Sequence, residues 1–496
     1  MNGSASVPIP AFQSATALLE RLRTREIGSR ELLEYFIRRI ERYDGTVNAV
    51  IVRDFERARV RADRADQAIS RGEVLGPLHG LPMTIKESFN FAGMPTTFGF
   101  LKFRDNIAAS NAVVIDRLLA AGAVIFGKTN VPPALMDGQS WNEIHGRTNN
   151  PWDRTRTPGG SSGGSAAALA AGLTGLDLGS DIASSIRNPS HYCGVFGHKP
   201  TYGLCPQRGH ALLETFQSVD IAVVGPLARS AKDLELELSV IAGPADAGSD
   251  AYSLALPRTR KRELKDFRVA IVLDDAFARV DRPVVDLLTR LKEFLVQEGA
   301  SVTEGERPAL ETEEYYRLFM VLLRAAGAAA ATDEEFARDV ALCEGANLSS
   351  GDMARLNAYG ATLSHRDWLR LDEKRQRYRQ TWREFFERFD LLLCPVLSTP
   401  AFAHSSVPPQ QRTLTVNGRE EPFENQLFWA GLAGLCYLPA SVAPIGLSPE
   451  GLPVGVQIIG PEYGDLTCLN FAQRLEERYR AFVAPPGFDD LSLNRP

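Results

Sequence analysis

The chain has 496 residues, of which 44% are hydrophobic and 23% charged, with a formal net charge of −6. This composition is typical of a globular protein, and the acidic balance without a basic run argues against a nucleic-acid partner. The apolar stretch 318–331 is too short to span a bilayer, and the N-terminus lacks the features of a secretory signal. The six cysteines show no disulfide or zinc spacing, so we expect a cytoplasmic protein without membrane contact.

The first 75 residues predict ordinary scaffold elements and contain no catalytic candidate. Hydrophobic spacing predicts helices over 14–26, 30–43 and 54–71, with a strand over 48–52. A buried strand follows at 83–85 and leads directly into Lys86. Strand ends are where α/β folds usually place functional groups. Taken alone, however, such a lysine is more often a surface residue whose stem covers apolar side chains.

A helix over 111–121 and a strand over 123–126 come next, and here a rival motif appears. Residues 122–129, GAVIFGKT, match the phosphate-binding pattern G-x-x-x-x-G-K-[ST]. The four residues between the glycines are apolar and β-prone, so they predict a strand rather than a phosphate-binding loop. A nucleotide-binding protein is therefore a minor alternative. Lys128 remains a second candidate for a general base at a strand end.

The most informative stretch is 157–201, which contains two serine pairs, at 161–162 and 184–185. A glycine–serine run alone would suggest a flexible linker. This run instead leads into a small-residue helix over 165–173 and a strand over 174–178. We interpret it as a tight turn whose backbone N–H groups are available to a ligand.

The segments GGSSGGS and SDIASSIRNPSHYCGVFGHKPT resemble the amidase signature family of serine hydrolases, as do GPLHGLPMTIKESFN upstream and LPVGVQIIGP near the C-terminus. The resemblance implies a single α/β domain over 1–496, with a mixed central β-sheet flanked by helices on both faces. The signature core would occupy about 75–245, and a more variable helical region about 311–389.

The family uses a Ser–cisSer–Lys triad, and its two serines are 24 positions apart, as Ser161 and Ser185 are here. The resemblance therefore implies Ser185 as nucleophile, Ser161 as the bridging serine and Lys86 as base. A serine hydroxyl needs a base to attack an amide, and burial can keep a lysine neutral by lowering its pKa. No G-x-S-x-G elbow surrounds any serine, so the sequence does not support a Ser-His-Asp triad.

The resemblance also assigns the oxyanion hole to the backbone N–H groups of Ile182, Ala183 and Ser184. The family commonly has two glycines where Ala183 and Ser184 stand, and a glycine with positive φ would be costly to replace. Asp181 and Arg187 bracket this turn. We expect both to anchor it, with substrate contact as a weaker role for Arg187.

Five residues are candidate walls of the substrate pocket: Met136, Gln139, Trp141, Phe428 and Trp429. Most are apolar, so they favour a small amide with a hydrophobic or aryl acyl group, although a carbamate or ester would suit the same chemistry. The segment 130–156 is expected to be a long polar loop near the substrate, and 405–425 an exposed loop.

Two alternatives remain besides the nucleotide binder. The family includes the glutaminase (A) subunit of tRNA-dependent amidotransferases, which needs a partner protein. A catalytically silent binding protein on the same scaffold belongs to another class, but it would not need to keep all three triad residues. We expect a small-molecule substrate, no cofactor and no metal, and the sequence leaves a homodimer open.

Overall fold

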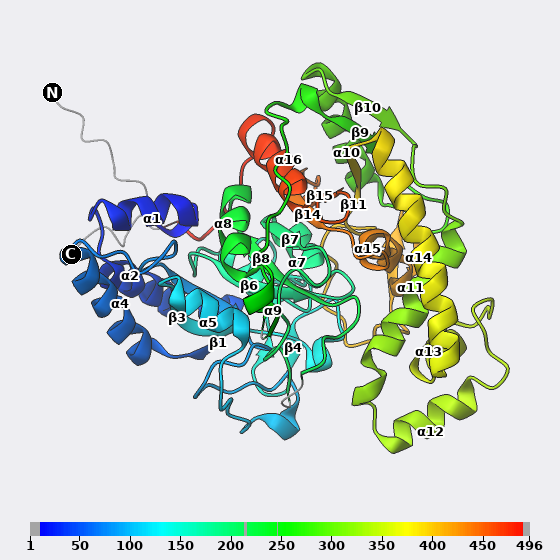
Figure 1. The fold of residues 1–496 in the computed structure, drawn as a ribbon, viewed down its shortest axis with the longest axis horizontal. Coiled ribbons are helices and arrows are strands. Elements are labelled where there is room, and N and C mark those ends of the chain that lie inside the picture. The colour runs from blue at the N-terminus through cyan, green and yellow to red at the C-terminus, as the bar shows by residue number, and fades with distance from the viewer. Residues whose placement is uncertain (1–9, 213–215, 246, 490–496) are drawn as a thin grey trace.

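The computed structural model describes residues 10–212, 216–245 and 247–489 (Figure 1). A mixed sheet of eleven strands runs through the molecule. Its strands are β1 (Val50–Arg53), β2 (Pro82–Lys86), β3 (Val124–Thr129), β6 (Asp177–Asp181), β7 (Phe196–Lys199), β8 (Val223–Ala228), β9 (Arg268–Ile271), β10 (Ser301–Glu304), β11 (Leu391–Pro395), β14 (Ala440–Leu447) and β15 (Pro453–Ile459). They lie in the order β1-β3-β2-β6-β8-β7-β14-β15-β11-β9-β10.

Helices flank this sheet (Figure 1). They are α1 (Ala15–Arg23), α2 (Ser29–Arg39), α3 (Gly45–Val47), α4 (Phe55–Ser70), α5 (Val113–Ala120), α6 (Gly163–Ala170), α7 (Arg187–Cys193), α8 (Ala231–Ile241), α9 (Ala247–Ala251), α10 (Arg282–Gln297), α11 (Thr312–Gly327), α12 (Asp333–Leu342), α13 (Met353–Ala361), α14 (His365–Arg388), α15 (Leu427–Gly434) and α16 (Asp465–Arg478). The predicted fold class, an α/β domain with a mixed central sheet, is confirmed.

The sheet brings the predicted site residues to one edge. Strand β2 pairs in parallel with β3 on one side and with β6 on the other. Lys86 ends β2 and Asp181 ends β6, so both lie at the carboxyl ends of neighbouring parallel strands. This is the edge at which open α/β sheets place their functional groups.

Two strands begin clearly later than predicted. The strand expected at 174–178 begins only at Asp177, because the chain bends at Gly175. The Thr174 hydroxyl donates to Leu176 O at 2.9 Å and accepts from the Thr84 N–H at 3.0 Å. The strand expected at 218–224 lies at β8, Val223–Ala228.

Two expected loops contain ordered hairpins. The segment 130–156 includes the short strands β4 (Trp141–Asn142) and β5 (Gly146–Arg147). The segment 405–425 is largely exposed, as expected, but it is not only a loop, since β12 (Thr413–Val416) and β13 (Arg419–Pro422) pair there. One face of this hairpin buries Leu414 and Val416 against Phe423.

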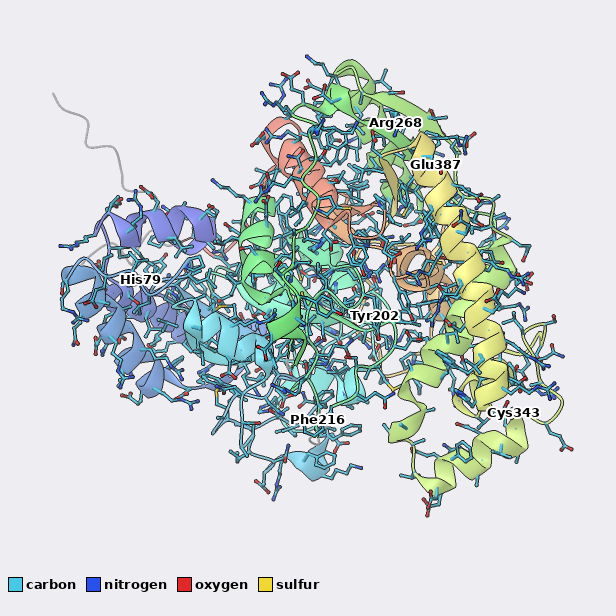
Figure 2. All side chains as sticks on the ribbon, viewed as in Figure 1. His79, Tyr202, Phe216, Arg268, Cys343 and Glu387 are labelled. Atoms are coloured by element: carbon cyan, nitrogen blue, oxygen red, sulfur yellow. The ribbon has the colours of Figure 1, made fainter. Side chains whose placement is uncertain are left out.

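Helix length and the state of the cysteines complete the description of the fold. None of the described helices is long and apolar enough to cross a bilayer. The six cysteines are free thiols, five of them buried. Cys343, the cysteine that is not buried, lies on the opposite side of the molecule from His79 (Figure 2).

Candidate active site

Lys86 and Ser161, 75 positions apart in the chain, are in direct contact. Lys86 Nζ donates to Ser161 Oγ at 2.7 Å and to Ser180 Oγ at 3.0 Å. Lys86 is 0% exposed, and Ser161 is also buried. The peptide bond between Gly160 and Ser161 is cis. Sequence reasoning did not single out Ser180, although it stands in the same SDIASS segment as the second serine pair.

The environment of Lys86 favours its neutral amine near neutral pH. Burial lowers its pKa to about 7, although the nearby carboxylates of Asp181, Asp177 and Glu87 raise it. A neutral amine can accept a proton, so the lysine that contacts the serine stretch has the property required of a base.

Lys128, the rival lysine, points elsewhere. Its Nζ donates to Pro95 O and, at 2.9 Å, to Thr96 Oγ1. Burial lowers its pKa to about 8. Gly127, Lys128 and Thr129 continue strand β3, where a phosphate-binding loop would need an irregular backbone. The motif at 122–129 is therefore part of the sheet.

Ser185 lies in the turn between β6 and α7, close to the first serine pair. The Ser162 N–H donates to Ser185 O at 3.1 Å, so a hydrogen bond joins the two serine pairs directly. Ser185 is 8% exposed. Among the residues that the structure describes, its Oγ has no hydrogen-bond partner. The hydroxyl is thus not committed to another residue in the described part of the chain.

The backbone of this turn offers several N–H groups, but not all of those expected. The Ser184 N–H already donates to Asp181 Oδ1 at 2.9 Å, so it is not free for an oxyanion. The N–H groups of Ile182, Ala183 and Ser185 have no acceptor within the described part of the chain. Ser184 adopts φ = 90°, a conformation that favours glycine, and its buried hydroxyl lacks a partner among described residues.

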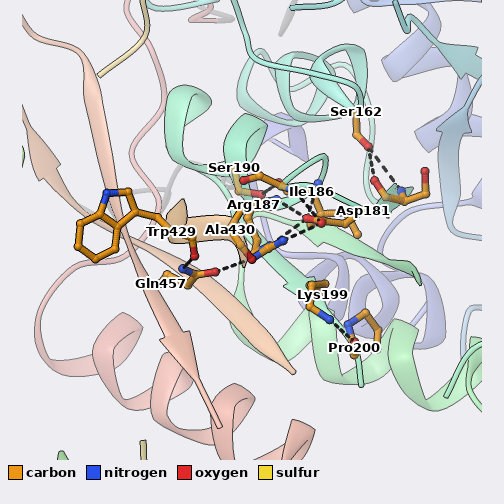
Figure 3. A network of polar contacts seen from close by, with 12 residues as sticks. Ser162, Asp181, Ile186, Arg187, Ser190, Lys199, Pro200, Trp429, Ala430 and Gln457 are labelled. Carbon is orange, nitrogen blue, oxygen red and sulfur yellow. Dashed lines mark hydrogen bonds and ion pairs between the residues drawn. The ribbon is translucent and has the colours of Figure 1, made fainter. Parts of the chain in front are cut away.

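Arg187 anchors the turn through a network of polar contacts, which Figure 3 shows. Its guanidinium donates to Asp181 at 2.8 and 3.0 Å, to Ala430 O at 2.8 Å and to Gln457 Oε1 at 2.7 Å. Gln457 in turn donates to Trp429 O at 2.9 Å. Although burial raises the pKa of Asp181, Arg187 holds it well below its usual range. A fully buried, fully engaged Arg187 serves the structure and not a substrate.

The five predicted pocket residues fall into two separate groups. Met136 and Trp141 are 57% and 40% exposed, and between them the buried Gln139 amide donates to Ser405 O at 2.9 Å. Phe428 and Trp429 belong to α15 and are buried. No hydrogen bond or ring pair joins the two groups within the described residues.

Phe428 and Trp429 are packed in the core, against residues 277 and 278. The Trp429 indole donates to Ala278 O at 3.1 Å, and Phe428 packs edge-on against Phe277 with ring centroids 6.0 Å apart. Both also line a small cavity with Leu392. Sequence patterns could not place them there, because the partners come from distant segments.

A serine–histidine–aspartate chain that the sequence did not reveal lies elsewhere. His198 Nδ1 is 2.9 Å from Ser441 Oγ, and its Nε2 is 3.1 Å from Asp465 Oδ1. All three side chains are fully buried, and the Thr201 N–H also donates to Asp465. A substrate cannot reach this serine, so the chain joins β7, β14 and α16 and is not a second triad.

Comparison with known proteins matches most of the chain. The profile of the Amidase family matches residues 31–469. The chain is 32% identical over 477 residues to an acylamidase of Rhodococcus erythropolis, covering 93% of this chain and 94% of that protein. It is also 32% identical over 499 residues to the A subunit of a glutamyl-tRNA(Gln) amidotransferase of Moorella thermoacetica (strain ATCC 39073 / JCM 9320), covering 94% and 96%.

Solved structures show the same likeness. One superposes with a TM-score of 0.79 at 28% identity, covering 95% of this chain and 100% of the other; it was reported with a vestigial protein complex and the evolutionary origins of an s-triazine catabolic enzyme.

Proposed function

This chain belongs to the amidase family of amide hydrolases, and on that basis we propose that it acts through Ser185 as nucleophile, Ser161 as proton bridge and Lys86 as general base. The observation that carries the proposal is the 2.7 Å hydrogen bond from a fully buried lysine to Ser161. The backbone hydrogen bond from Ser162 to Ser185 supports it, because it holds Ser185 close to Ser161.

The proposed acylation step follows from these positions. Ser185 Oγ attacks the amide carbonyl carbon as its proton passes to Ser161 Oγ and the Ser161 proton passes to the neutral amine of Lys86. The free N–H groups of Ile182 and Ala183, with that of Ser185, would stabilise the oxyanion. Lys86 then returns a proton through Ser161 to the departing nitrogen, the C–N bond breaks and an acyl-enzyme ester forms. Water attacks this ester by the same route.

The substrate class that we propose is a small amide with a hydrophobic or aryl acyl group. The similarity to an acylamidase supports it. The equal similarity to an amidotransferase component supports glutamine as a second candidate. A panel of aryl, aliphatic and carbamate acyl donors beside glutamine separates the two, since preferential release of ammonia from glutamine would favour the second.

Substitution of the two lysines tests the proposed roles. Lys86→Ala should lower kcat on the order of 10²-fold or more, as loss of a general base does. Ser161→Ala should be comparably severe, and the double variant little worse than either, because triad members act as a unit. Lys128→Ala is the matched control, since Lys128 is a second buried strand lysine without contact to the serines. An active Lys86→Ala protein beside an inactive, folded Lys128→Ala protein would overturn the assignment.

A further inference from the structure

A segment from the C-terminal part of the chain forms hydrogen bonds with the residues that precede Ser161. We call residues 401–423 the strap. The Thr157 N–H donates to Phe402 O at 3.0 Å, and the His404 N–H donates to Thr155 O at 3.1 Å. The strap therefore runs beside the residues that lead into the Gly159–Gly160–Ser161 turn.

A buried ion pair between Arg412 and Asp137 also holds the strap. Arg412 donates to both carboxylate oxygens of Asp137, at 2.7 and 3.0 Å. Its guanidinium lies 5.5 Å from the ring centroid of Phe402 and 4.8 Å from that of Phe423. Arg412 is only 5% exposed. A bidentate pair between two rings fixes the carboxylate in orientation as well as in position.

Gln139, two residues after Asp137, forms a second set of hydrogen bonds with the strap. Its Nε2 donates to Ser405 O at 2.9 Å, while its Oε1 accepts from the Ser405 N–H at 3.0 Å. The amide therefore bonds to the strap as a neighbouring strand would. Together Asp137 and Gln139 tie one short segment to the strap at both ends.

This segment packs directly against the Ser161 turn. A Cβ on Gly160 would overlap Asp137 O and would lie 2.5 Å from Gln139 O. Ser140 Oγ donates to Gly159 O at 3.1 Å and accepts from the Gly163 N–H at 3.0 Å. The backbone at 137–140 is thus the surface on which 159–163 rests.

We propose that Arg412 is a positioning residue for the serine that accepts from Lys86. It acts through Asp137, whose backbone supports Gly160 and with it Ser161. The inference rests on the proposed function, because it gives the strap a role in holding that proton bridge. Arg412 itself touches neither serine, so its effect is on the placement of Ser161 relative to Lys86 Nζ.

The chain offers a matched control in Arg375. This residue is 1% exposed, pairs with Asp220 and Asp372, and lies 4.5 Å over the Tyr437 ring. It therefore has the same chemistry as Arg412, but none of its contacts reaches the serine turn. Lysine at either site keeps the charge and loses the planar set of guanidinium donors.

The test compares Arg412→Lys with Arg375→Lys by kinetics and by hydrogen–deuterium exchange. A displacement of about 1 Å can cost about 10²-fold in rate, so Arg412→Lys should lower kcat about 10- to 100-fold with little change in KM. Exchange should rise in peptides covering 157–165 of that variant alone. Arg375→Lys should keep kcat within about 3-fold and leave exchange there unchanged.

Asp137→Asn, which is nearly isosteric, serves as the second variant if Arg412→Lys does not fold, and it should show the same pattern. Unchanged kcat and unchanged exchange at 157–165 in either folded variant would overturn the inference, as would equal losses in Arg375→Lys. Exchange is read without any substrate. A wild-type protein that hydrolyses no amide would therefore refute the proposed function, while exchange still tests the coupling of the strap to the serine turn.

Discussion

Lys86 carries the pH dependence that the proposed mechanism requires. Burial lowers its pKa to about 7, whereas an unperturbed lysine titrates at about 10.4. The protonated amine cannot accept a proton, so kcat/KM should rise with pH through about 7 and level off above it. Initial rates between pH 5 and 9 measure this. A flat profile, or a limb near pH 10, would contradict the role.

Asp177 provides the control for that profile. Burial raises its pKa to about 7, so it titrates in the same window. Its carboxylate also raises the pKa of Lys86. Asp177→Asn should therefore keep the acid limb and move it to lower pH. Disappearance of the limb in this variant would mean that Asp177, and not Lys86, was the group observed.

Ser184 has a left-handed backbone conformation, which is unfavourable for a residue with a side chain. A left-handed backbone costs an L-residue about 1–2 kcal/mol, and glycine avoids this cost. Ser184→Gly should raise the free energy of unfolding by about 1 kcal/mol, since it also removes a buried hydroxyl without a partner among the described residues. Ala183→Gly should lower it by up to about 1 kcal/mol. Urea denaturation of both variants decides, and a destabilised Ser184→Gly would contradict this view of the turn.

At the scale of elements, the contact between the 137–140 segment and the serine turn leaves no room for a side chain at Gly160. Gly160→Ala should destabilise the protein by at least about 2 kcal/mol through overpacking, or prevent folding. Gly327→Ala is the control, because a Cβ there meets nothing within 4 Å and lies at a helix end. Thermal melting compares them, and equal melting temperatures would refute the tight packing.

Local patterns predicted most elements, and long-range contacts explain the failures. The helix expected over 54–71 is α4, Phe55–Ser70, because its alanines repeat at helical spacing. The burial of Arg412 within the strap could not be predicted, since its partner Asp137 is 275 positions away. Likewise, no local pattern shows that the Ser184 N–H is used by Asp181.

At the scale of the whole molecule, one sheet assembles the site from three distant segments. β2 supplies Lys86, and the segments before α6 and after β6 supply the two serine pairs. The resemblance identified these residues because family motifs record their roles. It could not place the pocket residues, because their neighbours come from distant segments: Ala278 beside Trp429, Phe277 beside Phe428 and Ser405 beside Gln139.

Covalent labelling tests the central claim most directly. A fluorophosphonate reacts with an activated serine hydroxyl, and peptide mapping identifies the modified residue. We predict one adduct, on Ser185, formed in the wild-type protein and strongly slowed in Lys86→Ala. An adduct on Ser162, Ser184 or Ser441, or labelling of Ser185 at an unchanged rate without Lys86, would contradict the proposed triad.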